Sequence, residues 1–194
     1  MIAQLTGQFL HKTPTRVIVD CNGVGYEVHI SLNTYSVINP LDKGSLFTHM
    51  KVAEDAFTLY GFAELAEKEI FLKLISVSGV GAGTARMMLN SLKPVEIQQA
   101  IASNNIKLLE SIKGIGKKTA ERIALELRDK MGSITATGST VISLHNTAEQ
   151  EALEALVALG INKTVAEQAI RKTQSSSTGP LPVEAIIKQA LKFL

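Results

Sequence analysis

The chain has 194 residues, of which 45% are hydrophobic, and a formal net charge of +2 at pH 7. This length suits one large domain or two to three small ones. The absence of an 18-residue apolar run predicts no membrane span, and the N-terminus lacks the pattern of a signal peptide. One cysteine excludes an internal disulfide, so we expect a reduced, cytoplasmic setting. Four scattered histidines without ligand spacing predict neither a metal nor another cofactor.

Residues 1–63 are typical of β-structure. Asn22-Gly23 predicts a hairpin turn because both residue types tolerate a positive φ. Alternating apolar residues then predict a strand through Tyr26, Val28 and Ile30. The segments that remain are strands at Arg16–Cys21, Leu46–Val52 and Phe57–Phe62, and an ambiguous stretch at Ser31–Ile38 that fits a short helical turn. About five short strands indicate a small closed barrel, OB-like or SH3-like, and periodicity does not choose between them.

Residues 64–131 change to helical periodicity, and one pattern occurs in them twice. The copies span Leu74–Leu92 and Leu109–Leu127, 35 residues apart. Each is an apolar helical stretch, a Gly-aliphatic-Gly turn and a second helical stretch. The identical pairs include Leu74/Leu109, Gly79/Gly114, Gly81/Gly116, Thr84/Thr119, Ala85/Ala120 and Leu92/Leu127. Between the copies, Lys93-Pro94 should end a helix.

A Gly-x-Gly turn that opens a helix suits a phosphate group. The glycines allow close approach, and the first helical N–H groups are unpaired and point outward. The aliphatic residue between the glycines is expected to plug inward between the helices. Such contacts go to the nucleic-acid backbone and read no base. The candidate DNA-binding residues are Gly79, Val80, Gly81, Gly83 and Arg86 in the first copy, and Gly114, Ile115, Gly116, Lys117, Lys118, Thr119 and Arg122 in the second.

The two copies differ in charge. Lys117 and Lys118 can pair with phosphates, whereas Ala82-Gly83 stands at their positions in the first copy. The first copy should therefore depend on backbone donors and its arginine. Lys118 and Arg122 have an alternative role, which is pairing with Glu121 or Glu126 at helical spacing.

The modest net charge hides a segregation. Residues 65–130 carry 11 Lys/Arg and 7 Asp/Glu, whereas residues 1–64 carry 4 and 6. Residues 131–148 carry neither, and residues 149–194 carry 5 of each. The positive excess thus coincides with both glycine turns, which strengthens the nucleic-acid interpretation.

Nucleotide-binding motifs are excluded by residue identity. A Walker A loop needs a glycine five positions before its second glycine, where Ser111 precedes Gly116, and needs Lys-Ser/Thr afterwards, where two lysines follow. A dinucleotide fingerprint needs a third glycine, which is Thr119 here, and a preceding strand where a helix is expected.

Glu54-Asp55 lies between two expected strands and should top a hairpin. Acids at an exposed turn are usually only solvated. In a DNA-binding protein, however, adjacent carboxylates would repel phosphates and could hold strands apart. No catalytic constellation accompanies them.

Residues 132–148 lose all periodicity and are rich in Ser, Thr and Gly, which predicts a flexible linker. Residues 149–194 return to helical patterning. Gly160 is expected to end the first helix, and Asn162 to cap a second at Thr164–Thr173. A third helix is expected at Val183–Leu194, and the small shared core would lie around Leu156, Ile161, Ala169 and Ile186.

These motifs together resemble the RuvA family, the Holliday-junction-binding subunits of the bacterial branch-migration complex. The resemblance is carried by GVG, GIGKKTAERIALELRDK, VGYEV, EDAFTLYGF and EQEALEALVALG, and it runs the whole length. Helix-hairpin-helix motifs alone are widespread among DNA-repair proteins. Their combination and order here are specific.

The resemblance implies a multidomain α+β protein. Its parts would be an OB-fold domain over residues 1–63, a tandem helix-hairpin-helix domain over 64–131, the linker over 132–148 and a three-helix, UBA-like domain over 149–194. It implies a homotetramer, which can double into an octamer, that acts in recombination, DNA repair and the SOS response. Glu54 and Asp55 would form an acidic pin at the junction centre.

The resemblance also implies partners. The last domain would engage the RuvB ATPase motor, with Leu156, Leu159, Gly160 and Ile161 as candidate contacts. RuvC resolvase would be a further partner. The protein itself would be no enzyme. The lysine-poor first hairpin departs from the family pattern, which puts its side-chain contacts, not its backbone contacts, in question.

Two other classes stay open. A helix-hairpin-helix DNA glycosylase or lyase would need a nucleophilic lysine, for which Lys117 or Lys118 with Asp129 is the nearest candidate. A protein-interaction adaptor would bind no junction at all.

Overall fold

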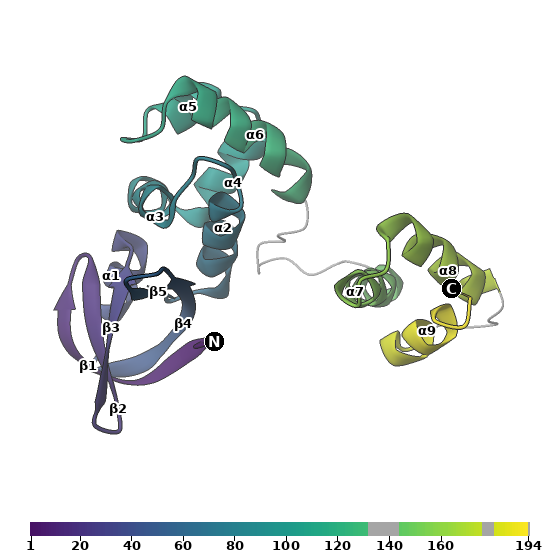
Figure 1. Ribbon diagram of the computed structural model, residues 1–194, viewed down its shortest axis with the longest axis horizontal. Helices are drawn as coiled ribbons and strands as arrows, with labels where there is room; N and C mark the ends of the chain where they lie inside the picture. The colour runs from purple at the N-terminus through teal and green to yellow at the C-terminus, as the bar shows by residue number, and fades with distance from the viewer. Residues whose placement is uncertain (132–143, 176–180, 194) are drawn as a thin grey trace. The chain divides into compact units, whose positions relative to one another are not determined.

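The computed structural model describes residues 1–131, 144–175 and 181–193 (Figure 1). These residues belong to two compact units, Met1–Ala136 and Thr137–Leu194, which we take separately. Among them, no helix has the length and apolar character needed to cross a membrane.

A closed barrel begins the first unit, with strand order β1-β2-β3-β5-β4 and a short helix, α1, between β3 and β4. The β3–β5 pair is parallel and the other pairs are antiparallel. The expected turn is present, with φ of 55° at Asn22 and 91° at Gly23. This arrangement confirms the OB-like alternative. The bounds are β1 Gln4–Thr13, β2 Arg16–Cys21, β3 Val24–Ile30, α1 Leu32–Ile38, β4 Lys43–Val52 and β5 Phe57–Phe62.

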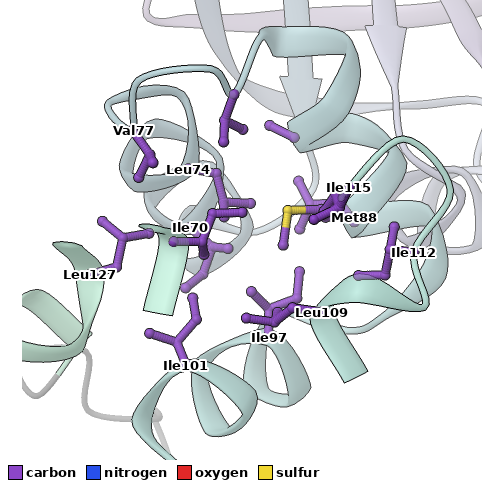
Figure 2. Close-up of a cluster of buried hydrophobic side chains, with 14 of the residues drawn as sticks. Ile70, Leu74, Val77, Met88, Ile97, Ile101, Leu109, Ile112, Ile115 and Leu127 are labelled. Atoms are coloured by element: carbon purple, nitrogen blue, oxygen red, sulfur yellow. The ribbon is translucent and has the colours of Figure 1, made fainter. Parts of the chain in front are cut away.

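Helices α2 to α6 complete this unit around one apolar core, in which side chains from both sequence repeats point toward one another (Figure 2). Helices α2 and α3 form the first hairpin, and α5 and α6 form the second. Helix α4 connects the two hairpins in the chain and packs on α6. Pro94 is the first residue of α4, a position that tolerates its missing N–H. The bounds are α2 Leu65–Ile75, α3 Ala82–Ser91, α4 Pro94–Ala102, α5 Ile106–Glu110 and α6 Lys117–Met131.

Hydrogen bonds from α1 attach the barrel to the first hairpin. The carboxylate of the buried Glu67, on α2, accepts hydrogen bonds from the hydroxyls of Ser31 and Thr34. Burial raises the pKa of Glu67, and the two hydroxyl donors oppose that rise. On the other side of α1, Asn33 Nδ2 donates to the carbonyl of Leu89 on α3 over 2.6 Å. The barrel and α3 therefore share a bonded joint.

The second unit contains α7 Leu144–Ala158, α8 Lys163–Ser175 and α9 Val183–Ala190. Leu156, Ala169 and Ile186 are buried in its core and Ile161 packs against it, as expected. Asn162 Oδ1 accepts from the backbone N–H of Thr164 and caps α8.

One boundary differs from the expectation. Helix α7 begins at residue 144, so the last part of the expected linker is helical. Within this added segment, Ala148 packs against the helical core. Residues 132–143 of the expected linker lie outside the described part of the chain.

Candidate DNA-binding site

The two hairpin turns have the same backbone geometry. Gly79 has φ of 90° and Gly114 has φ of 93°, a conformation that glycine adopts without strain. Val80 and Ile115 are each 5% exposed and plug into the core between the helices, as predicted. Their side chains cannot reach a ligand, so these two residues could offer only backbone groups to DNA. The glycines themselves face open space, because a Cβ added at Gly79 or Gly114 would meet no heavy atom within 4 Å.

Unpaired N–H groups lie where α3 and α6 begin. The first i→i−4 bonds run from Ala85 N to Gly81 O and from Ala120 N to Gly116 O, each 2.9 Å. The N–H groups before them precede the helical ladder and have no acceptor within it. Gly81 is the N-cap of α3, and a Cβ added there would meet no heavy atom within 4 Å, so its surroundings are open. One candidate is weaker: Thr119 N already donates to Gly116 O at 2.9 Å.

Lys117 and Lys118 open α6 and are both exposed. Within the described residues, neither side chain forms an ion pair or a hydrogen bond, so the alternative pairing of Lys118 with Glu121 or Glu126 is absent there. No acidic residue stands in the first turn of α6. The helix dipole and both ammonium groups therefore present positive charge at the same end.

Arg122 follows its alternative prediction. Its Nε lies 3.7 Å from Glu126 Oε1, and its NH1 donates to the carbonyl of Ser78 over 3.1 Å. Because Ser78 belongs to the first turn, Arg122 ties the two hairpins together. The expected phosphate contact of Arg122 stays a prediction.

Arg86 also has a partner within the protein. It was predicted to contact DNA from the first hairpin, and its NH1 lies 2.9 Å from Nδ1 of His29 on β3, in a half-buried contact. The guanidinium is thus directed at the barrel. Sequence reasoning missed His29, because the 57 residues between the partners give no local signal of their contact.

Glu54 and Asp55 lie at the tip that joins β4 to β5, and both are exposed. Ala53 N donates to Ala56 O over 2.9 Å and closes the turn, which confirms the predicted hairpin. Below the tip, Val52 pairs with Phe57, which is 77% exposed. The sequence alone predicted a strand residue at Phe57 and gave no sign of this exposure.

The candidate partner contacts in the second unit divide by burial. Leu156 is fully buried in the three-helix core, so its side chain supports the fold and cannot form a contact surface. Leu159 is 66% exposed, Gly160 has φ of 90° after α7, and Ile161 is half-buried against the core. The remaining surface candidates therefore cluster where α7 ends.

An OB-like barrel joined to two helical hairpins with matching Gly-x-Gly turns defines a tandem helix-hairpin-helix protein of the DNA-binding class. Family models agree with each part: "RuvA N terminal domain" matches residues 1–61, "SAM-like Helix-hairpin-helix tandem" matches 71–129, and "RuvA, C-terminal domain" matches 147–194.

Curated relatives extend this similarity over the full length. The proteins of Christiangramia forsetii and Flavobacterium psychrophilum are each 48% identical over 194 residues, and that of Cytophaga hutchinsonii is 45% identical over 200. Each alignment covers all of this chain and all of the relative, and each relative is named "Holliday junction branch migration complex subunit RuvA". The chain belongs to the RuvA family.

Proposed function

We propose that the protein binds Holliday junctions by their structure and not their sequence, as a non-catalytic homotetramer. It holds the junction open and recruits the RuvB ATPase, which drives branch migration in recombination and repair. The observation that carries the proposal is the pair of equivalent hairpin turns in one rigid core, with exposed Lys117 and Lys118 at the second. Backbone contacts of this kind ignore sequence, which lets a junction move through any sequence.

The acidic tip gives selectivity for a four-way junction over duplex. Glu54 and Asp55 are exposed at a hairpin tip, where they would repel phosphates and separate strands at the crossover. Four copies in a tetramer would cluster eight carboxylates and would add four weak backbone grips by avidity. Doubling into an octamer and contact with RuvC resolvase are parts of the same proposal that rest on family resemblance.

The second unit is the proposed site for RuvB. Leu159 is a large apolar side chain left exposed where α7 ends, which suits a protein contact. Gly160 and Ile161 follow it, while Leu156 supports them from the core. Removing residues 149–194 should spare junction binding and abolish stimulation by the motor.

The glycosylase alternative is less well supported. Lys117 and Lys118 are exposed, whereas an enzyme that excises bases holds a flipped base in a fitted pocket. Borohydride treatment with substrate DNA would trap a covalent adduct if either lysine were a nucleophile. Such an adduct would overturn the proposal.

Light scattering of the protein alone, with a four-way junction and with duplex of equal length tests the proposal directly. We expect a tetramer alone and a stoichiometric complex with the junction, which forms at salt concentrations that dissociate the duplex. Equal binding of both DNAs would contradict structure-selective binding, and no binding of either would favour the adaptor alternative.

A paired substitution tests the tip separately. Glu54→Gln with Asp55→Asn should retain or raise affinity for DNA, because repulsion is removed, and should lower the ratio of junction to duplex binding. Asp42→Asn with Glu110→Gln, two exposed acids elsewhere in the same unit, is the matched control. A collapse of affinity in the tip variant would show that the acids are not a repelling pin.

A further inference from the structure

The contact between Arg86 and His29 joins the first hairpin to the barrel. Arg86 NH1 donates across 2.9 Å, so His29 Nδ1 must accept and the imidazole must be neutral, with its proton on Nε2. Glu27 Oε1 lies 3.9 Å from that Nε2, and Arg16 pairs with Glu27 at 3.3 Å. From β5, the ring of Tyr60 lies 5.8 Å from the imidazole.

These neighbours favour the neutral imidazole. Burial lowers the pKa of His29, the Arg86 guanidinium lowers it further, and Arg16 adds to this, while Glu27 acts in the opposite direction. The contact is therefore formed at neutral pH and is lost when His29 takes up a second proton.

The contact also completes the attachment of α3. Hydrogen bonds from α1 reach the last turn of α3, where Asn90 Oδ1 accepts from Leu32 N at 2.9 Å. Arg86 lies about one turn nearer the glycine turn, so its bond is a second point of attachment. His29 in turn is the ladder partner of Tyr60 on β5, the strand that begins at the acidic tip. Together with the packing of α3 in the apolar core, these two points of attachment set the direction of α3 relative to the barrel.

We propose that Arg86 is a positioning residue that latches onto His29 and sets the first hairpin at a fixed distance from the acidic tip. The first hairpin then holds DNA by its backbone N–H groups, and Arg86 touches no phosphate. This inference rests on the proposed junction binding, in which the hairpins and the tip must engage one DNA molecule together.

Salt dependence separates positioning from phosphate contact. A lost phosphate contact lowers the slope of log affinity against log salt by about 0.9 for each subunit engaged. We expect Arg86→Gln to lower the ratio of junction to duplex binding several-fold with an unchanged slope. Lys117→Gln should lower the slope and is the positive control. A lower slope in Arg86→Gln would overturn the proposal, because Arg86 would then be a phosphate contact.

A pH profile tests the latch itself. Between pH 7.5 and 5, wild-type junction selectivity should fall as His29 becomes protonated. His29→Gln retains an acceptor for Arg86 and should keep selectivity across this range, whereas His29→Ala should be as unselective as Arg86→Gln at every pH. His49, on β4, is a second partly buried histidine near the first hairpin, with its ring 5.8 Å from that of Phe71 on α2. His49→Gln is the control and should keep the wild-type pH profile. Circular dichroism at each pH confirms folding.

Failure of the proposed function and failure of the latch give different results. A wild-type protein without preference for the junction contradicts the proposed function. A wild-type preference that His29→Ala and Arg86→Gln both leave intact contradicts the latch alone.

Discussion

The two helical hairpins have nearly the same backbone and different surroundings. Gly79 and Gly114 differ by only 3° in φ, and Val80 and Ile115 are buried to the same extent. Yet the first hairpin uses its arginine to hold the barrel, whereas the second leaves two lysines exposed at the start of α6.

This difference shows that two copies of one backbone motif can carry side chains with different contacts. The backbone of a Gly-x-Gly turn suffices to present N–H groups, so the side chains around it are free to change role. In the first hairpin the arginine bonds the barrel, and in the second the two lysines leave positive charge exposed. Even Arg122, a cation of the second hairpin, bonds the first turn through Ser78.

Removing the lysines should have the largest effect. Lys117→Gln with Lys118→Gln should lower junction affinity by about tenfold or more and lower the salt slope by up to about 2 for each subunit engaged. Fluorescence anisotropy over a salt series measures both. Lys93→Gln with Lys107→Gln, exposed lysines outside the turns, should change the slope far less. Equal slopes in the two double variants would mean that the second hairpin supplies no special charge.

The shared backbone can be tested by adding a methyl group to each turn. Gly79→Ala and Gly114→Ala should each cost about 1–2 kcal/mol of stability, because both force a side chain into a positive φ while meeting no neighbour within 4 Å. Chemical denaturation measures the loss. Gly23→Ala, with φ of 91° and equally open space in the barrel, is the control and should cost the same. Clearly unequal costs would show that the two turns are not equivalent.

The charge difference can also be reversed. Gly83 lies in α3 at the position of Lys118, is exposed and has open space around an added Cβ. Gly83→Lys should therefore fold well, raise junction affinity several-fold and steepen the salt slope by about 0.9 for each subunit engaged. Gly83→Gln separates charge from improved helix propensity, which alone adds somewhat under 1 kcal/mol of stability. If both variants bind alike, the first hairpin lies too far from phosphate for side chains to matter.

Local sequence signals predicted those parts of the fold that depend on interactions between neighbouring residues in the chain. The positive φ at Asn22-Gly23, the buried aliphatic residue in each glycine turn and the cap at Asn162 depend on neighbours in the chain. Strand β1 had no such signal: a register shift between Phe9 and His11 breaks its alternation. The OB-like topology also required knowledge of pairing between distant strands.

The candidate site was harder to predict where a charged side chain had several possible partners, either within the protein or on DNA. An exposed arginine after a glycine turn looks like a phosphate contact, but Arg86 has an acceptor on β3 that only the folded chain brings near. Conversely, the alternative pairing of Arg122 with Glu126 was accessible because helical spacing is local. Glu67 gave no sequence signal, since its two hydroxyl donors lie 33 and 36 residues away.

The smallest expected effect concerns Glu67, which attaches the first hairpin to the barrel through Ser31 and Thr34. Because its folded pKa is raised, its contribution to stability is fully present below the unfolded value near 4.5 and is lost as pH rises through the folded pKa. Glu67→Gln removes this titration, so the stability of the variant relative to wild type should improve as pH rises from about 5 to 8. Glu110→Gln, an exposed acid on α5, should show no such trend.

The measurement can be centred on the barrel and its joint with α2. All three tyrosines, Tyr26, Tyr35 and Tyr60, lie in the barrel or α1, and the ring of Tyr60 lies 5.1 Å from that of Phe71 on α2, so near-ultraviolet circular dichroism during thermal unfolding reports on this region. A relative stability that is flat with pH would mean that Glu67 keeps the same charge in the folded and unfolded chain. Burial would then be fully offset by the hydroxyls of Ser31 and Thr34, and the joint would be an ionised cluster at every pH where the protein binds DNA.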